Sequence, residues 1–373
     1  MRSLLFSILL STLAAGPVIN YAMAKPVLVG TCLPNLKTYP TISQAVSAVS
    51  PGSTVLVCPG NYPEQVTITQ SLTLRGVESA NSVNPVLVVP QGGLTQSISS
   101  PINGIQIFFQ ILVNGTDSSL VKISNIAADG ENNGVPQGAG LAGIYYVNSS
   151  GMIDRVAVHR QFANRAGHGI LVDSSTSSSK TITVSNSSVH DYDAEGIRTS
   201  SGPPPSPLTV DIHSNSVISS ESLSGDPVSG GIDSDAAGKI WGNRVLTGPQ
   251  PLGTSSGVGI SVASGMTIAR NTVAGYTIGI GELGDSNTIK ENRVSLAEGG
   301  IGVSGRNNVV QYNSILDIVH GGDAIGFNCT GTSNVVTHNV INDSYWGIID
   351  DHGNNVLTPN SFSNVTKIVS PPC

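Results

Sequence analysis

One short phrase recurs through the second half of this sequence and constrains its fold more than any other feature. From about residue 143 onward, a Gly-Ile pair (once Ala-Ile) is followed by alternating residues, a short turn, an apolar segment and an Asn. The pairs are Gly143-Ile144, Gly169-Ile170, Gly196-Ile197, Gly231-Ile232, Gly259-Ile260, Gly279-Ile280, Gly300-Ile301, Ala324-Ile325 and Gly347-Ile348. Intervals of about 20 to 35 residues are typical of solenoid proteins, in which one structural unit stacks upon the next.

Each repeat holds three short strands. Because side chains alternate between the two sides of a strand, the Ile and Val positions of successive rungs are expected to form one apolar core. A parallel series of Asn residues is expected to face inward at a tight turn, where Asn tolerates left-handed backbone and bonds the rungs above and below. The series is Asn186, Asn215, Asn243, Asn271, Asn292, Asn313, Asn339 and Asn360. The pattern predicts an all-β fold, a parallel β-helix of stacked three-strand rungs.

The N-terminal part of the chain predicts a cap for this stack. A parallel solenoid exposes unpaired strand edges at its ends and has to cover them. Residues 41–50 place apolar side chains at helical spacing on one face, namely Ile42, Ala45, Val46 and Val49. We expect Thr41 to cap this helix and Pro51-Gly52 to end it.

This helix, followed by "GNYPEQVTI" at 60–68, "LTLRG" at 72–76 and the Gly-Ile and Asn repeats, resembles the pectin-lyase-like superfamily of right-handed parallel β-helices. The resemblance covers nearly the whole mature chain and is nearest to the generic β-helix-repeat group, whose functions are mixed or unassigned. It implies a single domain over residues 25–373, with an N-terminal cap at about 38–60 and regular repeats at about 143–365. Copper-linked periplasmic β-helix proteins share the repeat, but the sequence supplies no Met or His cluster for copper.

The first 24 residues have the pattern of a secretory signal peptide. Met1-Arg2 precede a short apolar run that ends at Ala22-Met23-Ala24. We therefore expect a mature chain that starts at Lys25 and is secreted or periplasmic. The apolar run is too short to span a membrane. The formal net charge of −7 argues against a nucleic-acid partner, which requires a basic surface. The mature chain is expected to be a monomer.

The cysteine count favours disulfides. The chain has four cysteines, Cys32, Cys58, Cys329 and Cys373, and an even number in an exported protein is typical of disulfide bonding. Three pairings are open. Because a solenoid keeps sequence neighbours close and separates its ends, we expect Cys32–Cys58 and Cys329–Cys373, one bridge at each end of the stack.

Charged residues gather on three consecutive rungs of the Gly-Ile strand. If each Ile points inward, the residue after it and the residue two further on point outward. Most rungs carry small or neutral residues there, but three of them supply Asp173, Arg198, Asp233 and Asp235. Neighbouring rungs lie about 4.8 Å apart, so these side chains are expected to share a patch about 10 Å across.

Other residue types useful in carbohydrate chemistry occur close to this patch in the sequence. His168 and Glu195 lie in the turns that precede the charged positions, and they are added to the candidate catalytic residues. Tyr145 and Tyr192 are candidate sugar-stacking residues. Long insertions at about 90–140, 201–209 and 247–257 flank the same rungs, and in solenoids such insertions usually line the binding face.

This set of residues suits the cleavage of an acidic polysaccharide. A pair of carboxyl groups catalyses glycoside hydrolysis in many enzymes. An arginine can bind the carboxylate of an acidic sugar, or assist the abstraction of a proton next to that carboxylate. In the pectin-lyase-like superfamily, polysaccharide lyases and galacturonan hydrolases use this strand face with such residues, so the resemblance implies one of these activities. The aspartates are also candidate ligands for Ca²⁺. No other cofactor is expected.

A non-catalytic interpretation stands beside the enzymatic one. Opposite charges on neighbouring strands attract one another. Arg198 and the aspartates could therefore form a ladder of solvated salt bridges that has only a structural role. In that case the chain is a surface or periplasmic β-helix that binds glycan or protein. Fold alone does not decide between an enzyme and a binding protein.

Overall fold

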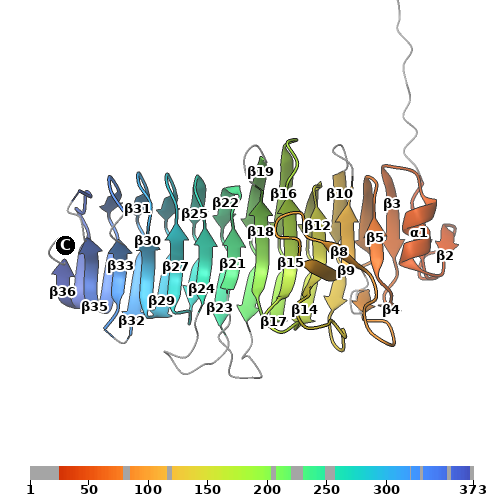
Figure 1. Cartoon of the computed structure of the whole chain (residues 1–373), viewed down its shortest axis with the longest axis horizontal. Helices are drawn as coiled ribbons and strands as arrows, with labels where there is room; N and C mark the ends of the chain where they lie inside the picture. The colour runs from red at the N-terminus through yellow and green to blue at the C-terminus, as the bar shows by residue number, and fades with distance from the viewer. Residues whose placement is uncertain are drawn as a thin grey trace, which may run out of the picture.

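The computed structural model describes residues 25–78, 85–115, 120–202, 207–219, 230–247, 257–319, 321–327, 331–350 and 354–369. Over these ranges the chain is a right-handed parallel β-helix, which confirms the predicted fold class. Figure 1 shows an elongated stack that runs from α1 (Ile42–Ala48) to β36 (Ser361–Val369). The predicted signal peptide, Cys329 and Cys373 lie outside the described residues.

Three faces of parallel strands enclose the core. The first face is a 13-stranded sheet made of β2 (Lys37–Tyr39), β1 (Val27–Val29), β3 (Ser53–Val57), β6 (Leu72–Gly76), β10 (Leu120–Ser124), β13 (Ser150–Asp154), β16 (Lys180–Ser185), β19 (Leu208–His213), β22 (Ala237–Trp241), β25 (Met266–Ala269), β28 (Thr288–Lys290), β31 (Val309–Gln311) and β34 (Val335–Thr337). The second face holds β4 (Asn61–Pro63), β7 (Val86–Val88), β11 (Ala127–Asp129), β14 (Ala157–Gln161), β17 (Ser188–Tyr192), β20 (Ser216–Ser219), β23 (Arg244–Thr247), β26 (Thr272–Ala274), β29 (Arg293–Ala297) and β32 (Ser314–Ile318). The third face holds β5 (Val66–Ile68), β9 (Gln106–Asn114), β12 (Gly140–Val147), β15 (Gly167–Ser174), β18 (Glu195–Ser201), β21 (Gly230–Ser234), β24 (Val258–Val262), β27 (Ile278–Leu283), β30 (Gly299–Val303) and β33 (Asp323–Phe327). The long strands β35 (Val340–Asp350) and β36 continue both the second and the third face.

The Gly-Ile pairs form the third face with the expected phase. Their Ile residues are register partners from rung to rung, as in Ile232, Ile260 and Ile280, and these three side chains are fully buried. The inward-facing apolar residues of all three faces belong to one continuous core. Because this column of Ile side chains points inward, the residues that alternate with Ile on the third face point outward.

The glycine of each pair is required by close packing at the corner between the second and third faces. A Cβ on Gly279 would overlap Cγ1 of Val294 and would lie 2.8 Å from the backbone oxygen of Gly300. Gly259 stands in the same relation to Val273 and to the oxygen of Gly279. The glycine therefore recurs because these rungs turn the same tight corner, and the rung of Ala324 is the exception.

The predicted Asn series forms a buried ladder, with one exception. From Asn215 to Asn360, each side-chain Nδ2 donates to Oδ1 of the next member at 2.9 to 3.0 Å. Asn186 was placed in this series incorrectly: it is exposed at φ 51°, and Ser187 occupies the inward position, where its backbone N donates to Asn215 Oδ1. A second ladder, which the repeats did not predict, is formed by Asn287, Asn308, Asn334 and Asn355.

The N-terminal end is capped as expected. Thr41 is the N-cap of α1, and its side-chain oxygen accepts a hydrogen bond from the backbone N of Gln44 at 3.2 Å. The helix buries Ile42, Ala45 and Val46 on the core. The predicted Cys32–Cys58 disulfide is present, with a Cα–Cα distance of 5.7 Å.

A short hairpin covers part of the third face. β8 (Ser97–Ser99) pairs antiparallel with β9, and the segment around it lies over the outer surface of β12 and β15. A satellite apolar cluster forms beneath it, with Ile107, Phe109, Tyr145 and Leu171 among its buried members. On the rungs of β12 and β15, side chains on the outer side of the strand are therefore buried beneath the hairpin.

Candidate functional site

Four of the predicted catalytic residues come together on the third face. His168 on β15, Glu195 and Arg198 on β18, and Asp233 on β21 form a chain of contacts that we call the His168–Asp233 cluster. His168 Nδ1 lies 2.9 Å from Glu195 Oε2, and Arg198 Nη1 lies 3.7 Å from the same oxygen. Arg198 Nε lies 3.8 Å from Asp233 Oδ2. One guanidinium group therefore stands within 4 Å of both carboxylates.

Strand register and glycines place these side chains. Arg198 and Asp233 are direct register partners on neighbouring rungs. Glu195 has Gly230 as its partner on the next rung, so no side chain crowds it from that side. The turn before His168 is held by Asp193, whose carboxylate accepts hydrogen bonds from the backbone N atoms of Ala163, Arg165 and Gly167 at 2.7 to 3.0 Å.

The cluster is partly buried but still open to solvent. The side chains of His168 and Glu195 are 10% and 15% exposed, whereas those of Arg198 and Asp233 are 33% and 25% exposed. Such partial burial strengthens electrostatic interactions and leaves room for a ligand to approach.

The environments of the two carboxyl groups drive their pKa values apart. Burial, together with the neighbouring Glu195 carboxylate, raises the pKa of Asp233 to about 6, although Arg198 and a hydrogen bond from Ser261 oppose the rise. Burial would also raise the pKa of Glu195, but the contacts with His168 and Arg198 outweigh it and hold this pKa below its ordinary value. At a pH between the two pKa values, Asp233 is protonated and Glu195 is ionised. A general acid and a general base require these two protonation states.

Asp173 does not join the cluster. Its side chain is 3% exposed, and Oδ2 accepts hydrogen bonds from Ser100 Oγ and from the Tyr145 hydroxyl, both at 2.6 Å. The residue ties the β8–β9 hairpin to the third face. Its predicted catalytic role is corrected to a structural one, because the hairpin covers the rung on which it lies. Asp235, in contrast, is exposed beyond the end of β21, where its negative charge raises the pKa of Asp233.

Neither predicted sugar-stacking tyrosine is at the surface. Tyr145 is fully buried under the β8–β9 hairpin, and Tyr192 is 1% exposed within the main core. Burial raises the pKa of both hydroxyl groups. The expectation is corrected for both residues, since an enclosed ring has no face to offer to a sugar.

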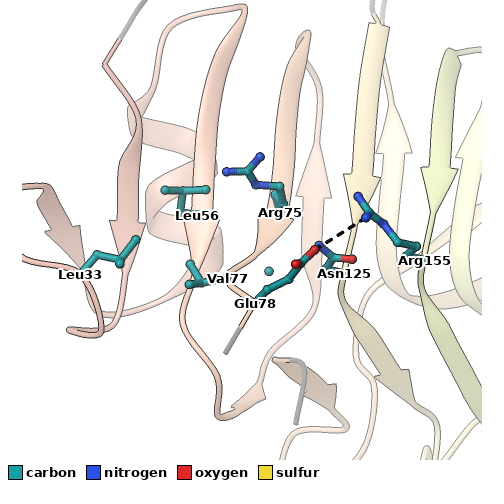
Figure 2. A pocket seen from close by; sticks show the side chains of 8 residues that line it. Leu33, Leu56, Arg75, Val77, Glu78, Asn125 and Arg155 are labelled. Atoms are coloured by element: carbon teal, nitrogen blue, oxygen red, sulfur yellow. Dashed lines mark hydrogen bonds and ion pairs between the residues drawn. The ribbon is translucent and has the colours of Figure 1, made fainter. Parts of the chain in front are cut away.

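Two surface cavities lie away from the cluster. One, of about 260 Å³, opens on the outer side of the first face near the disulfide. Figure 2 shows its Glu78 directed toward Asn125 and Arg155, while Arg75 points the other way over Leu56. The other, of about 290 Å³, is lined by Asp129, Glu131, Asn132 and residues 88–92.

Metal-binding side chains do not converge within the described ranges, where no group of three or more His, Cys, Asp or Glu is placed to hold an ion. Two histidine rings, His159 and His190, do stack within these ranges, with centroids 5.2 Å apart. Each ring faces its own carboxylate: Nδ1 of His159 lies 3.5 Å from Asp129, and Nδ1 of His190 lies 2.8 Å from Asp191. The described residues also include no helix that could span a membrane.

Comparison with known proteins places this chain among β-helices. The A-module of mannuronan C-5 epimerase AlgE4 from Azotobacter vinelandii superposes with a TM-score of 0.60 at 13% identity, over 86% of this chain and 89% of that chain. The GH136 lacto-N-biosidase from Eubacterium ramulus gives a TM-score of 0.63 at 11% identity, over 91% of this chain and 68% of that chain. At these identities the likeness shows the fold alone.

At the level of sequence, no curated protein matches the chain. A family model does match, over residues 174–371, and its description is periplasmic copper-binding protein (NosD). The matched segment spans more than half of the chain and includes most of the Gly-Ile and Asn repeats, together with Glu195, Arg198 and Asp233. The chain described here therefore belongs to the NosD family of periplasmic β-helix proteins.

Proposed function

We propose that this protein is an exported glycan-active β-helix that hydrolyses an acidic polysaccharide at the His168–Asp233 cluster. The observation that carries the proposal is the pair of carboxyl groups that share Arg198 and have pKa values shifted in opposite directions. In this reaction protonated Asp233 donates its proton to the glycosidic oxygen as the bond to the sugar breaks. Glu195, held ionised by His168 and Arg198, acts on the opposite side as the base for water or as the nucleophile.

The charge of the cluster favours an anionic substrate at mildly acidic pH. When Asp233 is protonated, the charges of Glu195 and Arg198 neutralise each other. Once Asp233 ionises, the cluster carries an excess of negative charge that repels an acidic sugar. Binding and proton donation therefore depend on the same proton, the one on Asp233.

The comparisons support a carbohydrate substrate only indirectly. The similar solved structures are named as a mannuronan epimerase and a lacto-N-biosidase, which shows that this fold carries such activities in other proteins. Export is proposed from the N-terminal signal-peptide pattern and from the family's periplasmic description.

The same family description implies copper, and the described residues do not fit that metal. Copper sites are built from His, Met and Cys ligands that converge. Here Cys32 and Cys58 form a disulfide, so their sulfur atoms are not available as thiolate ligands. Met152 and Met266 lie on different sides of the first face. The stacked rings of His159 and His190 each face a separate carboxylate. No step of the proposed reaction uses copper.

A screen of residues 25–373 against plant, algal and bacterial polysaccharides tests the proposal. We expect new reducing ends without absorbance near 235 nm, because hydrolysis leaves no unsaturated product. Asp233→Asn should abolish release, whereas Asp317→Asn, an exposed aspartate on β32, should leave it unchanged. Absorbance near 235 nm would indicate a lyase instead, and full activity of Asp233→Asn would remove the cluster from the reaction.

Non-catalytic binding is the second candidate, and one observation favours it: every charge of the cluster already has a partner within it. Folded protein that releases nothing from a broad panel, yet binds an acidic glycan in calorimetry, would establish this alternative. Addition of Ca²⁺ or of a chelator to each assay tests the candidate role of that ion.

A further inference from the structure

A tryptophan is displayed on the outer surface of the first face, midway along the stack. Trp241 ends β22, and its neighbours are His213 on β19 and Ala269 on β25 (Figure 1 labels all three strands). Ile240 points into the core, so Trp241 points outward, and its side chain is only partly buried. A large aromatic side chain on the outside of a β-helix calls for an explanation, because the apolar core does not need it.

The indole ring is held in one orientation. Its Nε1–H donates a hydrogen bond to Asp211 Oδ1 at 2.8 Å. The ring of His213 stacks against one of its faces, with centroids 4.5 Å apart and planes 15° apart. Two contacts from the preceding rung therefore fix the ring before any ligand arrives, which lowers the entropy cost of binding.

On the next rung the neighbour of the ring is a small side chain. The register partner of Trp241 on the next rung is Ala269, and the described residues place no second ring and no Lys or Arg over the indole. The next residue in this column is Lys290, partner of Ala269 on β28. With rungs about 4.8 Å apart, the backbone of Lys290 is about 10 Å from that of Trp241.

Two lysines make this surface basic in an otherwise acidic chain. Lys239 lies two residues before Trp241 on the same strand and is exposed, and Lys290 is partly exposed. Neither has a carboxylate within 4.0 Å in the described part of the chain. Two acids lie close to them: Asp211 is the register partner of Lys239 and is hydrogen bonded to Trp241, and Glu291, which follows Lys290, is paired with Arg270.

We propose that Trp241, Lys239 and Lys290 form a second glycan-binding site, which takes a pyranose ring that bears a carboxylate. The apolar face of the sugar packs on the open face of the indole, and the carboxylate reaches the lysine ammonium groups. A uronate fits this combination of an oriented ring and unpaired cations, whereas a neutral sugar gains only the stacking contact. The site lies on the first face, apart from the His168–Asp233 cluster on the third, and does not depend on the proposed hydrolysis.

Tryptophan fluorescence tests this proposal directly, because the chain has two tryptophans, Trp241 and Trp346. In the Trp346→Phe variant all tryptophan emission comes from Trp241. Titration with α-1,4-linked trigalacturonate should change this emission in a saturable way, and maltotriose at the same concentrations should not. The double change Lys239→Gln with Lys290→Gln should weaken binding about tenfold, as expected for the loss of two ionic contacts. Lys122→Gln, an exposed lysine on β10 of the same face, should leave it unchanged.

Calorimetry of the unmodified chain and of Trp241→Ala gives a second measurement that does not require removal of Trp346. We expect the heat of trigalacturonate binding at this site to disappear in Trp241→Ala. The proposal is overturned if Trp241 emission does not respond, if maltotriose produces the same response, or if Trp241→Ala binds as the unmodified chain does. None of these readouts measures bond cleavage, so failure here is distinct from failure of the proposed hydrolysis.

Discussion

The asparagine ladder makes the sharpest prediction about stability, because two asparagines that look equivalent in the repeats have different environments. Asn292 is 1% exposed and connects its own rung to the rungs on both sides. It accepts hydrogen bonds from the backbone N and from Nδ2 of Asn271, at 2.9 and 3.0 Å. Its Nδ2 donates to the backbone oxygen of Ile268 and to Asn313 Oδ1. Asn186, in contrast, is exposed, and its side chain donates a single hydrogen bond to Asp154 at 2.8 Å.

We expect Asn292→Ala to lower the free energy of unfolding by about 3 kcal/mol. The change removes the acceptor of the buried backbone N of Asn271, and an unsatisfied buried donor costs about 1 to 3 kcal/mol. The other lost hydrogen bonds contribute about 1 kcal/mol each where water cannot replace them. Asn186→Gly should cost less than about 1 kcal/mol, because the side chain is exposed and glycine tolerates the positive φ at this position.

Urea unfolding followed by far-ultraviolet circular dichroism measures both variants. A solenoid can unfold in segments, so the comparison rests on the transition midpoint and slope of each variant against the unmodified chain. If Asn292→Ala and Asn186→Gly shift the midpoint equally, the ladder does not stabilise the stack in the way its hydrogen bonds imply, and the inward placement of Asn292 is wrong.

Further predictions concern the core, the disulfide and the cluster. Ile280→Ala should lower the free energy of unfolding by about 2 to 5 kcal/mol, because it leaves a cavity in the central column, and calorimetric melting measures this loss. Reduction of Cys32–Cys58 should increase hydrogen exchange at the N-terminal rungs and leave the middle of the stack unchanged, since a solenoid transmits stability only between neighbours. Glycan release should fall as pH rises through about 6, where Asp233 ionises. The native pKa of Asp233 is raised, so its contribution to stability is present at low pH and is lost as pH rises through about 6; Asp233→Asn should remove this slope from a plot of melting temperature against pH.

The sequence predicted the parts of the fold that repeat. Alternation and the Gly-Ile phase were sufficient to place Ile280 inward and Arg198 outward, because each rung repeats the geometry of the one before. The same regularity brought Arg198 beside Asp233, and the capping helix followed from apolar spacing and Thr41. These predictions depended only on local pattern and on parallel register.

What the sequence did not predict came from contacts that break the repeat. Asp173 and Tyr145 lie at outward positions, yet the β8–β9 hairpin covers them, and no alternation rule reports a hairpin folded over another strand. Asn186 lies one position from the inward turn residue, and a shift of one residue reverses the side to which a side chain points. Tyr192 ends its strand with the ring turned into the core. His168 and Glu195 were expected in turns, but they lie on the neighbouring strands β15 and β18, each two residues before the Ile of its pair.

The tight corner at each Gly-Ile pair has a consequence for how such a protein changes length. Since Gly279 and Gly300 turn the same corner, residues 280–300 form an interchangeable module whose two boundaries match. Removal of this module would join Gly279 to Ile301 and bring Asn271 opposite Asn313, so that both the apolar column and the ladder would continue across the junction. Insertions and deletions of whole rungs are therefore the changes this architecture accepts most readily, whereas a single added residue at a corner would displace every strand that follows.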